Sequence, residues 1–144
     1  MAIQAAIIGL GQIGASFGLA LADQKTPIQR TGHDLEHGTA RLAAKKGAVD
    51  KTNFNLPSTV READFVILAI PMDQVRATLE TIAQDLRENC VVFDTSPVKR
   101  PVLEWAQEIL PPNRYFIGLT PVISGQYLLD SKAGIDAADR KSVV

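Results

Sequence analysis

Three glycines near the N-terminus have the spacing of a phosphate-binding loop. Residues 9–14 read Gly9-Leu10-Gly11-Gln12-Ile13-Gly14 and match the pattern G-x-G-x-x-G. The apolar run Ile3–Ile8 precedes the loop and Gln12–Asp23, which has helical periodicity, follows it, so the loop joins a predicted strand to a predicted helix. In that position the first glycine permits a tight turn, the second lets the backbone approach a pyrophosphate, and the third lets the helix pack closely on the sheet. The pattern therefore predicts a dinucleotide site.

This loop carries no cationic side chain. We expect the backbone amides at the start of the helix, together with the positive end of its dipole, to bind the phosphates. A loop for nucleoside triphosphates ends instead in Gly-Lys-Ser or Gly-Lys-Thr, and no such ending is present here. The residues predicted to hold the pyrophosphate are Gly9, Leu10, Gly11, Gln12, Ile13 and Gly14.

Asp34 is the candidate for recognition of the adenosine ribose. It lies 20 residues after Gly14, where a dinucleotide-binding unit places an acidic residue at the end of its second strand. The carboxylate can accept hydrogen bonds from both ribose hydroxyls and would repel a 2′-phosphate, and no lysine or arginine follows before Arg41. NAD is therefore favoured over NADP as the cofactor. The alternative is that Asp34 caps the helix that follows it.

A second motif overlaps the glycine loop and indicates a different chemistry. Residues 14–18 read G-x-S-x-G, the pattern of a hydrolase nucleophile elbow, with Ser16 at its centre. An elbow serine sits on the strand-to-helix turn itself, whereas Ser16 falls within the predicted helix. The two histidines, His33 and His37, are both early in the chain, and a triad of this type needs a late one. The hydrolase interpretation is therefore disfavoured.

Short apolar runs alternate along the chain with segments of helical period. The runs expected to be strands are Ile3–Ile8, Ile28–Gly32, Ala48–Lys51, Asp64–Ile70, Val91–Phe93 and Tyr115–Gly118. The segments expected to be helices are Gln12–Asp23, Glu36–Lys46, Pro57–Ala63, Asp73–Leu86 and Pro101–Leu110, with a partly helical tail from Ser124 to Val144. Strands apolar on both faces are typical of a parallel sheet covered by helices. The pattern predicts an α/β fold with a doubly wound, mostly parallel sheet, the Rossmann fold.

Composition places this chain among ordinary globular domains and excludes several function classes. Its 144 residues suit one domain spanning residues 1–144, and 46% of them are hydrophobic. The formal net charge is −1, from 15 basic and 16 acidic side chains without a charged block, so neither nucleic acid nor membrane is expected as a partner. One cysteine, Cys90, excludes an internal disulfide and a multi-cysteine metal site, and we expect no metal. Without a secretion signal, the expected location is cytoplasmic.

Several segments together resemble the nucleotide-binding domain of the prephenate/arogenate dehydrogenase family. The glycine loop with Ala15 and Ser16 is similar to that family's loop. The other segments that carry the resemblance are residues 43–50, 63–71, 94–99, 101–104, 110–111, 116–118 and 133–139. Among them, Ala69, Ile70 and Pro71 fall where the family's fourth strand ends at the cofactor. The resemblance covers nearly the whole chain.

This resemblance implies oxidative decarboxylation of a cyclohexadienol acid, with hydride passed to a nicotinamide and an aromatic product formed. Two polar catalytic positions of the family are altered: its serine falls on Pro97, one place after Ser96, and its histidine falls on Thr120. A threonine hydroxyl cannot accept a proton near neutral pH as an imidazole can. The catalytic residues therefore stay unassigned. Lys99 matches the family, but we expect it to be a solvated lysine near a helix start.

The family also has an all-helical domain that dimerises and completes the substrate pocket, and this domain is absent from the 144 residues. A homodimer is thus a possibility that the resemblance adds. Our first hypothesis is the cofactor domain of an oxidoreductase acting on a small carboxylic acid, with Thr95, Ser96 and Thr120 nearest the nicotinamide. A β-hydroxyacid dehydrogenase is a variant of it. The alternative is a non-catalytic NAD-binding or sensing module.

Overall fold

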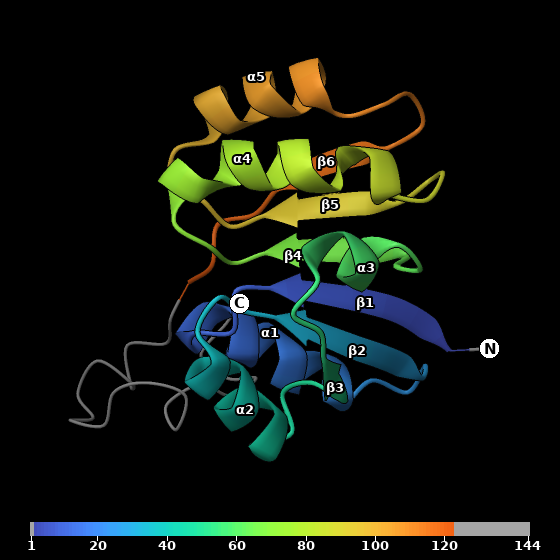
Figure 1. The fold of residues 1–144 in the computed structure, drawn as a ribbon, viewed down its shortest axis with the longest axis vertical. Coiled ribbons are helices and arrows are strands. Elements are labelled where there is room, and N and C mark those ends of the chain that lie inside the picture. Colours follow the sequence, from blue (N-terminus) through green and yellow to red (C-terminus); the bar gives the residue numbers. More distant parts are fainter. Residues whose placement is uncertain (1, 123–144) are drawn as a thin grey trace.

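A single parallel sheet organises the chain in the computed structural model, which describes residues 2–122 (Figure 1). In that range the six strands are β1 (Ile3–Ile8), β2 (Ile28–His33), β3 (Lys51–Thr52), β4 (Phe65–Leu68), β5 (Val91–Asp94) and β6 (Tyr115–Gly118). Their order is β3-β2-β1-β4-β5-β6, and all five neighbouring pairs are parallel. This is the doubly wound arrangement, so the predicted fold class is confirmed. The predictions for residues 124–144 lie outside the described residues.

Helices cover the sheet on both faces. They are α1 (Gln12–Ala22), α2 (His37–Lys45), α3 (Leu56–Val60), α4 (Met72–Ile82) and α5 (Lys99–Ile109), with a 3₁₀ turn, η1 (Ala83–Asp85), after α4. One core cluster joins Ile8 and Leu68 to apolar residues of α3, α4 and α5, and the other joins Ile7 and Ile67 to α1 and α2. Successive strand residues thus serve opposite faces, which explains why the central strands are apolar throughout.

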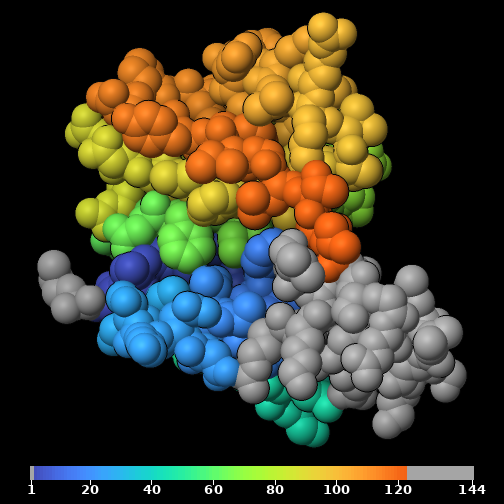
Figure 2. Space-filling model, turned by 180° about the vertical axis from the view of Figure 1, so that it is seen from behind, coloured from blue at the N-terminus to red at the C-terminus, as the bar shows by residue number. Residues whose placement is uncertain are grey.

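The sheet ends at β6, whose outer face is open. Figure 2 shows the chain around β6, in orange, at the surface of the face turned away from the viewer in Figure 1. Tyr115 and Ile117 are exposed there, whereas Phe116, which points the other way, packs against the cluster that contains α4 and α5. This alternation follows from the two-residue period of a strand at the sheet edge.

Most predicted boundaries differ from the structure by a residue or more, and the predicted helix Asp73–Leu86 ends as an α-helix at Ile82. The third strand was expected over Ala48–Lys51, but Ala48 and Val49 are buried in a turn and pairing begins at Lys51. The fifth helix begins at Lys99 rather than Pro101, so the proline occupies the third helical position. That position is tolerated because the first amides of a helix have no intrahelical partner. The fourth strand ends at Leu68, two residues earlier than predicted.

A buried arginine fastens β2 to the neighbouring turn and to α1. The guanidinium of Arg30, a residue only 7% exposed, donates to the carbonyl oxygens of Gly18, Gly47 and Ala48 at 2.9, 2.7 and 3.0 Å. It also forms an ion pair of 2.8 Å with Asp50, which accepts the Arg30 backbone amide as well. Burial raises the pKa of Asp50, but the hydrogen bonds and charge of Arg30 outweigh it and hold the pKa below its ordinary 3.8. The ionised carboxylate is therefore part of the folded structure.

Substitution of Asp50 tests how much its ion pair with Arg30 stabilises the fold and how that contribution changes with pH. We expect Asp50→Asn to lower the free energy of unfolding at pH 7 by about 1–2 kcal/mol, a discounted value because the carboxyl is partly exposed. Since the pKa of Asp50 is depressed by folding, its contribution is present above pH 3.8 and is lost as the pH falls through the folded pKa. Urea unfolding at a series of pH values measures this.

The control is Glu104→Gln, which changes an exposed carboxylate on α5 and should alter stability by less than about 0.5 kcal/mol. If the difference in free energy of unfolding between the wild type and Asp50→Asn stayed constant down to pH 2, the role assigned to the negative charge of Asp50 would be contradicted.

Candidate functional site

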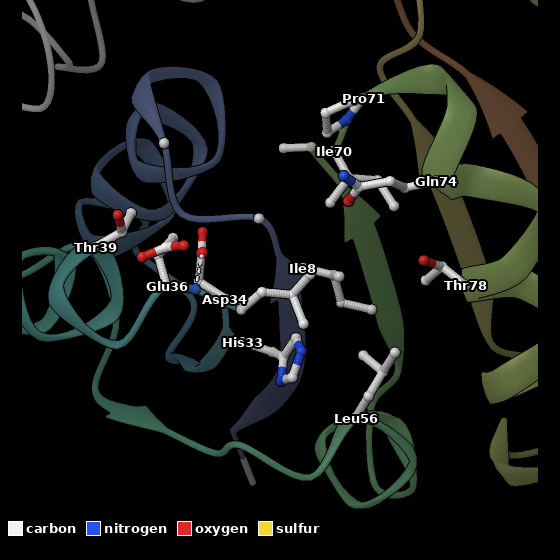
Figure 3. Close-up of a pocket in the computed structure, with 14 residues that line it drawn as sticks. Ile8, His33, Asp34, Glu36, Thr39, Leu56, Ile70, Pro71, Gln74 and Thr78 are labelled. Atoms are coloured by element: carbon white, nitrogen blue, oxygen red, sulfur yellow. Dashed lines mark hydrogen bonds between the residues drawn. The ribbon is translucent and has the colours of Figure 1, made fainter.

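A cavity of about 450 Å³ opens at the carboxyl ends of β1, β2 and β4 (Figure 3). The strand order reverses here, because the chain runs outward from β1 through β2 to β3 and then returns to β4 on the other side of β1. In doubly wound sheets this switch point is where ligands bind. Six of the residues predicted for the cofactor line the cavity: Gly9, Gly11, Asp34, Ala69, Ile70 and Pro71.

Glycine is required at two positions of the loop by packing alone. Gly9 has a φ of +91°, and a Cβ there would overlap the carbonyl oxygen of Ala69. A Cβ on Gly14 would overlap the carbonyl oxygen of Gly9. The loop, the start of α1 and the end of β4 therefore meet through backbone atoms.

Gly11 is different, because the protein itself gives no steric reason for it. A Cβ on Gly11 would meet no heavy atom within 4 Å, and this exposed residue lines the cavity. The space that the absent side chain leaves is open to a ligand. A pyrophosphate, which needs close backbone approach at this position of the pattern, fits that observation.

The start of α1 presents amides to the same place. Gly11 is the N-cap, no side chain caps the helix, and its first turn has no acidic residue. The first amides of a helix lack intrahelical acceptors and form the positive end of its dipole. The cavity lining includes neither lysine nor arginine; its side-chain donors include the neutral Thr39, Gln74 and Thr78, and the start of α1 adjoins it at Gly11.

Asp34 connects the glycine loop to the end of β2. Its Oδ2 accepts the amide of Leu10 at 2.8 Å and its Oδ1 accepts the amide of Glu36 at 2.8 Å. Glu36, not Asp34, is the N-cap of α2, so the predicted alternative role as a helix cap is wrong. A carboxylate has about four lone-pair sites, so two remain for hydroxyl groups in the cavity.

The remaining predicted residues support the loop without lining the cavity. Leu10 is fully buried, and its side chain packs against Gly32 of β2. Gln12, Ile13 and Gly14 form the first turn of α1, and none of them lines the cavity. The structure thus separates the residues that face the cavity from those that shape the loop behind them.

Eight further lining residues were not predicted as site residues from the sequence. They are Ile8, His33, Leu35, Glu36, Thr39, Leu56, Gln74 and Thr78. Figure 3 shows Glu36 and Thr39 beside Asp34 on one wall, with Ile70, Gln74 and Thr78 opposite. A signal existed for two of them, because Gln74 and Thr78 are four residues apart on the helix that follows Pro71 and share its face.

His33, the last residue of β2, is buried. Only 6% of it is exposed, and its Nδ1 lies 2.9 Å from the carbonyl oxygen of Asn53. The ring lies below Ile8 in Figure 3 and lines the cavity. Burial of a polar ring requires such a partner, which the strand pattern alone does not reveal.

The polar residues after β5 are occupied within the protein. Asp94 is fully buried, and its Oδ1 accepts the hydroxyl of Ser96 at 2.7 Å. The hydroxyl of Thr95 donates to the carbonyl oxygen of Leu68 at 2.9 Å. Ser96 is only 2% exposed, so its hydroxyl is not presented to a substrate.

Lys99 is not the solvated lysine that the sequence suggested. Its Nζ donates to the carbonyl oxygens of Leu119 and Asp94 and lies 3.7 Å from Oδ2 of Asp94. The lysine therefore joins the ends of β5 and β6 and balances the buried carboxylate. Thr120, at the other position where the resemblance breaks, is exposed.

The elbow interpretation of Ser16 finds no support in the structure. Ser16 lies within α1, is 1% exposed, and donates its hydroxyl to the carbonyl oxygen of Gln12 at 2.7 Å. A nucleophile needs an exposed hydroxyl on the turn. Within residues 2–122, no group of three acidic, histidine or cysteine side chains is placed to hold a metal ion, and no helix meets the length and hydropathy of a membrane span.

Comparison with known proteins identifies the family. Residues 17–143 match the family profile described as prephenate dehydrogenase, nucleotide-binding domain. The chain belongs to this family. The prephenate dehydrogenase of Bacillus subtilis is 30% identical over 133 residues, which are 92% of this chain and 34% of the relative. The family match begins after the glycine loop, so the geometry of Gly9, Gly11 and Gly14 is an independent observation.

Solved structures agree with the nucleotide-binding-domain assignment. The arogenate dehydrogenase of Synechocystis has a TM-score of 0.79 and 26% identity, over 95% of this chain and 45% of the other. The Aquifex aeolicus prephenate dehydrogenase, solved with hydroxyphenyl propionate and NAD⁺, has a TM-score of 0.77 and shares the fold at 22% identity, over 94% and 46%. The chain spans about a third of the length of the curated relatives it matches.

The buried carboxylate after β5 generates a stability prediction. Ser96→Ala removes a hydrogen bond to fully buried Asp94, one of whose oxygens already lacks a hydrogen-bond partner. We expect a loss of about 1–3 kcal/mol in the free energy of unfolding, because a buried charged acceptor is then left without a donor. Urea unfolding measures it. Ser58→Ala, which removes an exposed hydroxyl, is the control, and equal effects of the two substitutions would contradict the prediction.

Proposed function

We propose that this chain is the NAD-binding domain, residues 1–144, of a cytoplasmic oxidoreductase that passes hydride to NAD from a small carboxylic acid of the prephenate or arogenate type. The observation that carries the proposal is the open space at Gly11 beside the carboxylate-lined cavity. The family membership and the NAD⁺ bound by the Aquifex protein support it. Homodimerisation through a helical domain, which the resemblance implies, belongs to the same proposal.

Different residues would bind different parts of the cofactor. Gly11 and the amides of the first turn of α1 hold the pyrophosphate, and the free lone pairs of Asp34 accept the adenosine ribose hydroxyls. Ala69, Ile70 and Pro71 exclude water along the opposite wall. Bound NAD supplies the hydride acceptor, and this domain orients it.

A second candidate is a non-catalytic NAD-binding or sensing module. Two observations after β5 favour it. The hydroxyl of Ser96 is buried and bonded to Asp94, and Pro97 stands where the resemblance places the family's serine. Turnover of prephenate or arogenate by the full-length protein would favour the enzyme. Binding of NAD without turnover of either acid would favour the module.

Gly11→Ala tests the pyrophosphate site. Because the added methyl group meets no protein atom, we expect an unchanged melting temperature but a loss of NAD affinity of about tenfold or more, since it occupies the space of the phosphates. Titration calorimetry with NAD measures the affinity.

Gly38→Ala is the matched control, because Gly38 in α2 is equally open and lies outside the cavity lining. It should leave NAD binding unchanged. Wild-type affinity in Gly11→Ala would remove the main support for the proposed site.

Asp34→Asn tests the cofactor preference. We expect the wild type to bind NAD at least about tenfold more tightly than NADP, because a carboxylate and a 2′-phosphate repel one another. Asparagine keeps an acceptor for one of the two amides that Asp34 binds, and the preference for NAD should narrow. Asp73→Asn, an exposed carboxylate outside the cavity lining, is the control. Tighter binding of NADP by the wild type would contradict the role of Asp34.

A further inference from the structure

His33 is a buried imidazole that lines the cavity. It is the last residue of β2. Its side chain lies on the opposite face of the strand from Arg30 and Gly32, the face that is turned toward α1 and the turn before β3. Figure 3 shows its ring below Ile8, with Leu56 to the right and Glu36 and Thr39 farther up on the left. The ring is thus a polar group set among apolar neighbours.

Asn53 fixes which ring nitrogen carries the proton. A carbonyl oxygen only accepts, so the contact of 2.9 Å between Nδ1 of His33 and the Asn53 oxygen requires the hydrogen on Nδ1. Asn53 is itself held, because its amide donates to the carbonyl oxygen of Gly32 at 3.0 Å and its side chain binds Ser58 and the amide of Asn55. In the neutral ring, Nε2 is therefore an acceptor.

That acceptor is available to a ligand. Among the described residues nothing is hydrogen-bonded to Nε2, and the only fully buried side-chain nitrogen or oxygen without a partner is Oδ2 of Asp94. Nε2 thus remains accessible, and His33 lines the cavity. A ligand that enters this region without a donor would desolvate the lone pair at a cost.

Adenine has the matching chemistry. With its ribose at Asp34, the base would enter between Ile8, Leu56 and Ile70, whose apolar side chains suit the faces of a purine. The base carries an exocyclic amino group, a donor that needs an acceptor once water is excluded. We propose that Nε2 of His33 accepts a hydrogen bond from this amino group and so selects adenine over a base with a carbonyl there. This inference rests on the proposed function.

The selection depends on the locked tautomer. In hypoxanthine a carbonyl oxygen replaces the amino group and would face the lone pair of Nε2. Moving the proton to Nε2 would set the lone pair of Nδ1 against the Asn53 carbonyl, so the ring cannot adapt without losing that hydrogen bond. Gln74, whose amide can turn to offer either a donor or an acceptor, does not discriminate in this way.

The experiment compares NAD with nicotinamide hypoxanthine dinucleotide by titration calorimetry. We expect the wild type to prefer NAD by about tenfold, equivalent to about 1.4 kcal/mol. In His33→Phe, which keeps a flat ring without nitrogen, the two ligands should bind equally. In His37→Phe the preference should persist, because His37 is exposed, stacks on Phe54 and does not line the cavity.

A second measurement does not depend on the folding of a variant. In ¹⁵N spectra of the wild type, Nδ1 of His33 should be the protonated nitrogen, and the Nε2 resonance should shift with NAD but far less with the hypoxanthine analogue. Equal affinities of the wild type for both ligands, or a preference that survives in His33→Phe, would overturn the inference and leave NAD binding intact. Binding of neither ligand would overturn the proposed function itself.

Discussion

The close approach of three backbone segments determines the geometry of the cavity. Gly9 meets the carbonyl of Ala69, and Gly14 meets the carbonyl of Gly9, with no room for a side chain at either glycine. These contacts bring the end of β1, the start of α1 and the end of β4 to one point. The cavity forms there because the backbone turns away in two directions, toward β2 and toward β5. Gly11, free of such contacts, is left facing the opening.

Carboxylates that accept backbone amides fasten segments along the strands, and one of them, Asp34, does so beside that point. Asp50 accepts the amide of Arg30, Asp64 accepts that of Gln4 at 2.8 Å, and Asp34 accepts that of Leu10. Each bond joins segments that are distant in the sequence and satisfies a backbone donor that the parallel ladder leaves free. Asp34 differs from the others because it also lines the cavity. A residue that shapes the loop is thus in a position to meet the ligand, so loop geometry and ribose recognition would be coupled.

The sequence predicted the doubly wound parallel sheet, the glycine loop and the placement of Asp34 at the end of the second strand, because glycine spacing and apolar runs are local signals. It did not predict the roles of His33, Ser96 or Lys99. Each of these depends on a partner whose position only the fold determines: Asn53 for His33, Asp94 for Ser96, and Leu119 with Asp94 for Lys99. A polar residue near a strand end can be solvated or buried, and its own neighbours in the sequence do not decide which.

Within residues 2–122, polar groups with and without partners lie around different strands of this sheet. Around β1, β2 and β4 several hydrogen-bonding groups have no partner among the described residues. They are the first amides of α1, the remaining lone pairs of Asp34, and Nε2 of His33. After β5 the polar side chains are instead bonded to one another, and Lys99 balances Asp94. A buried carboxylate held by a lysine and a serine stabilises the junction of β5 and β6 and leaves those groups unable to serve a substrate without rearrangement.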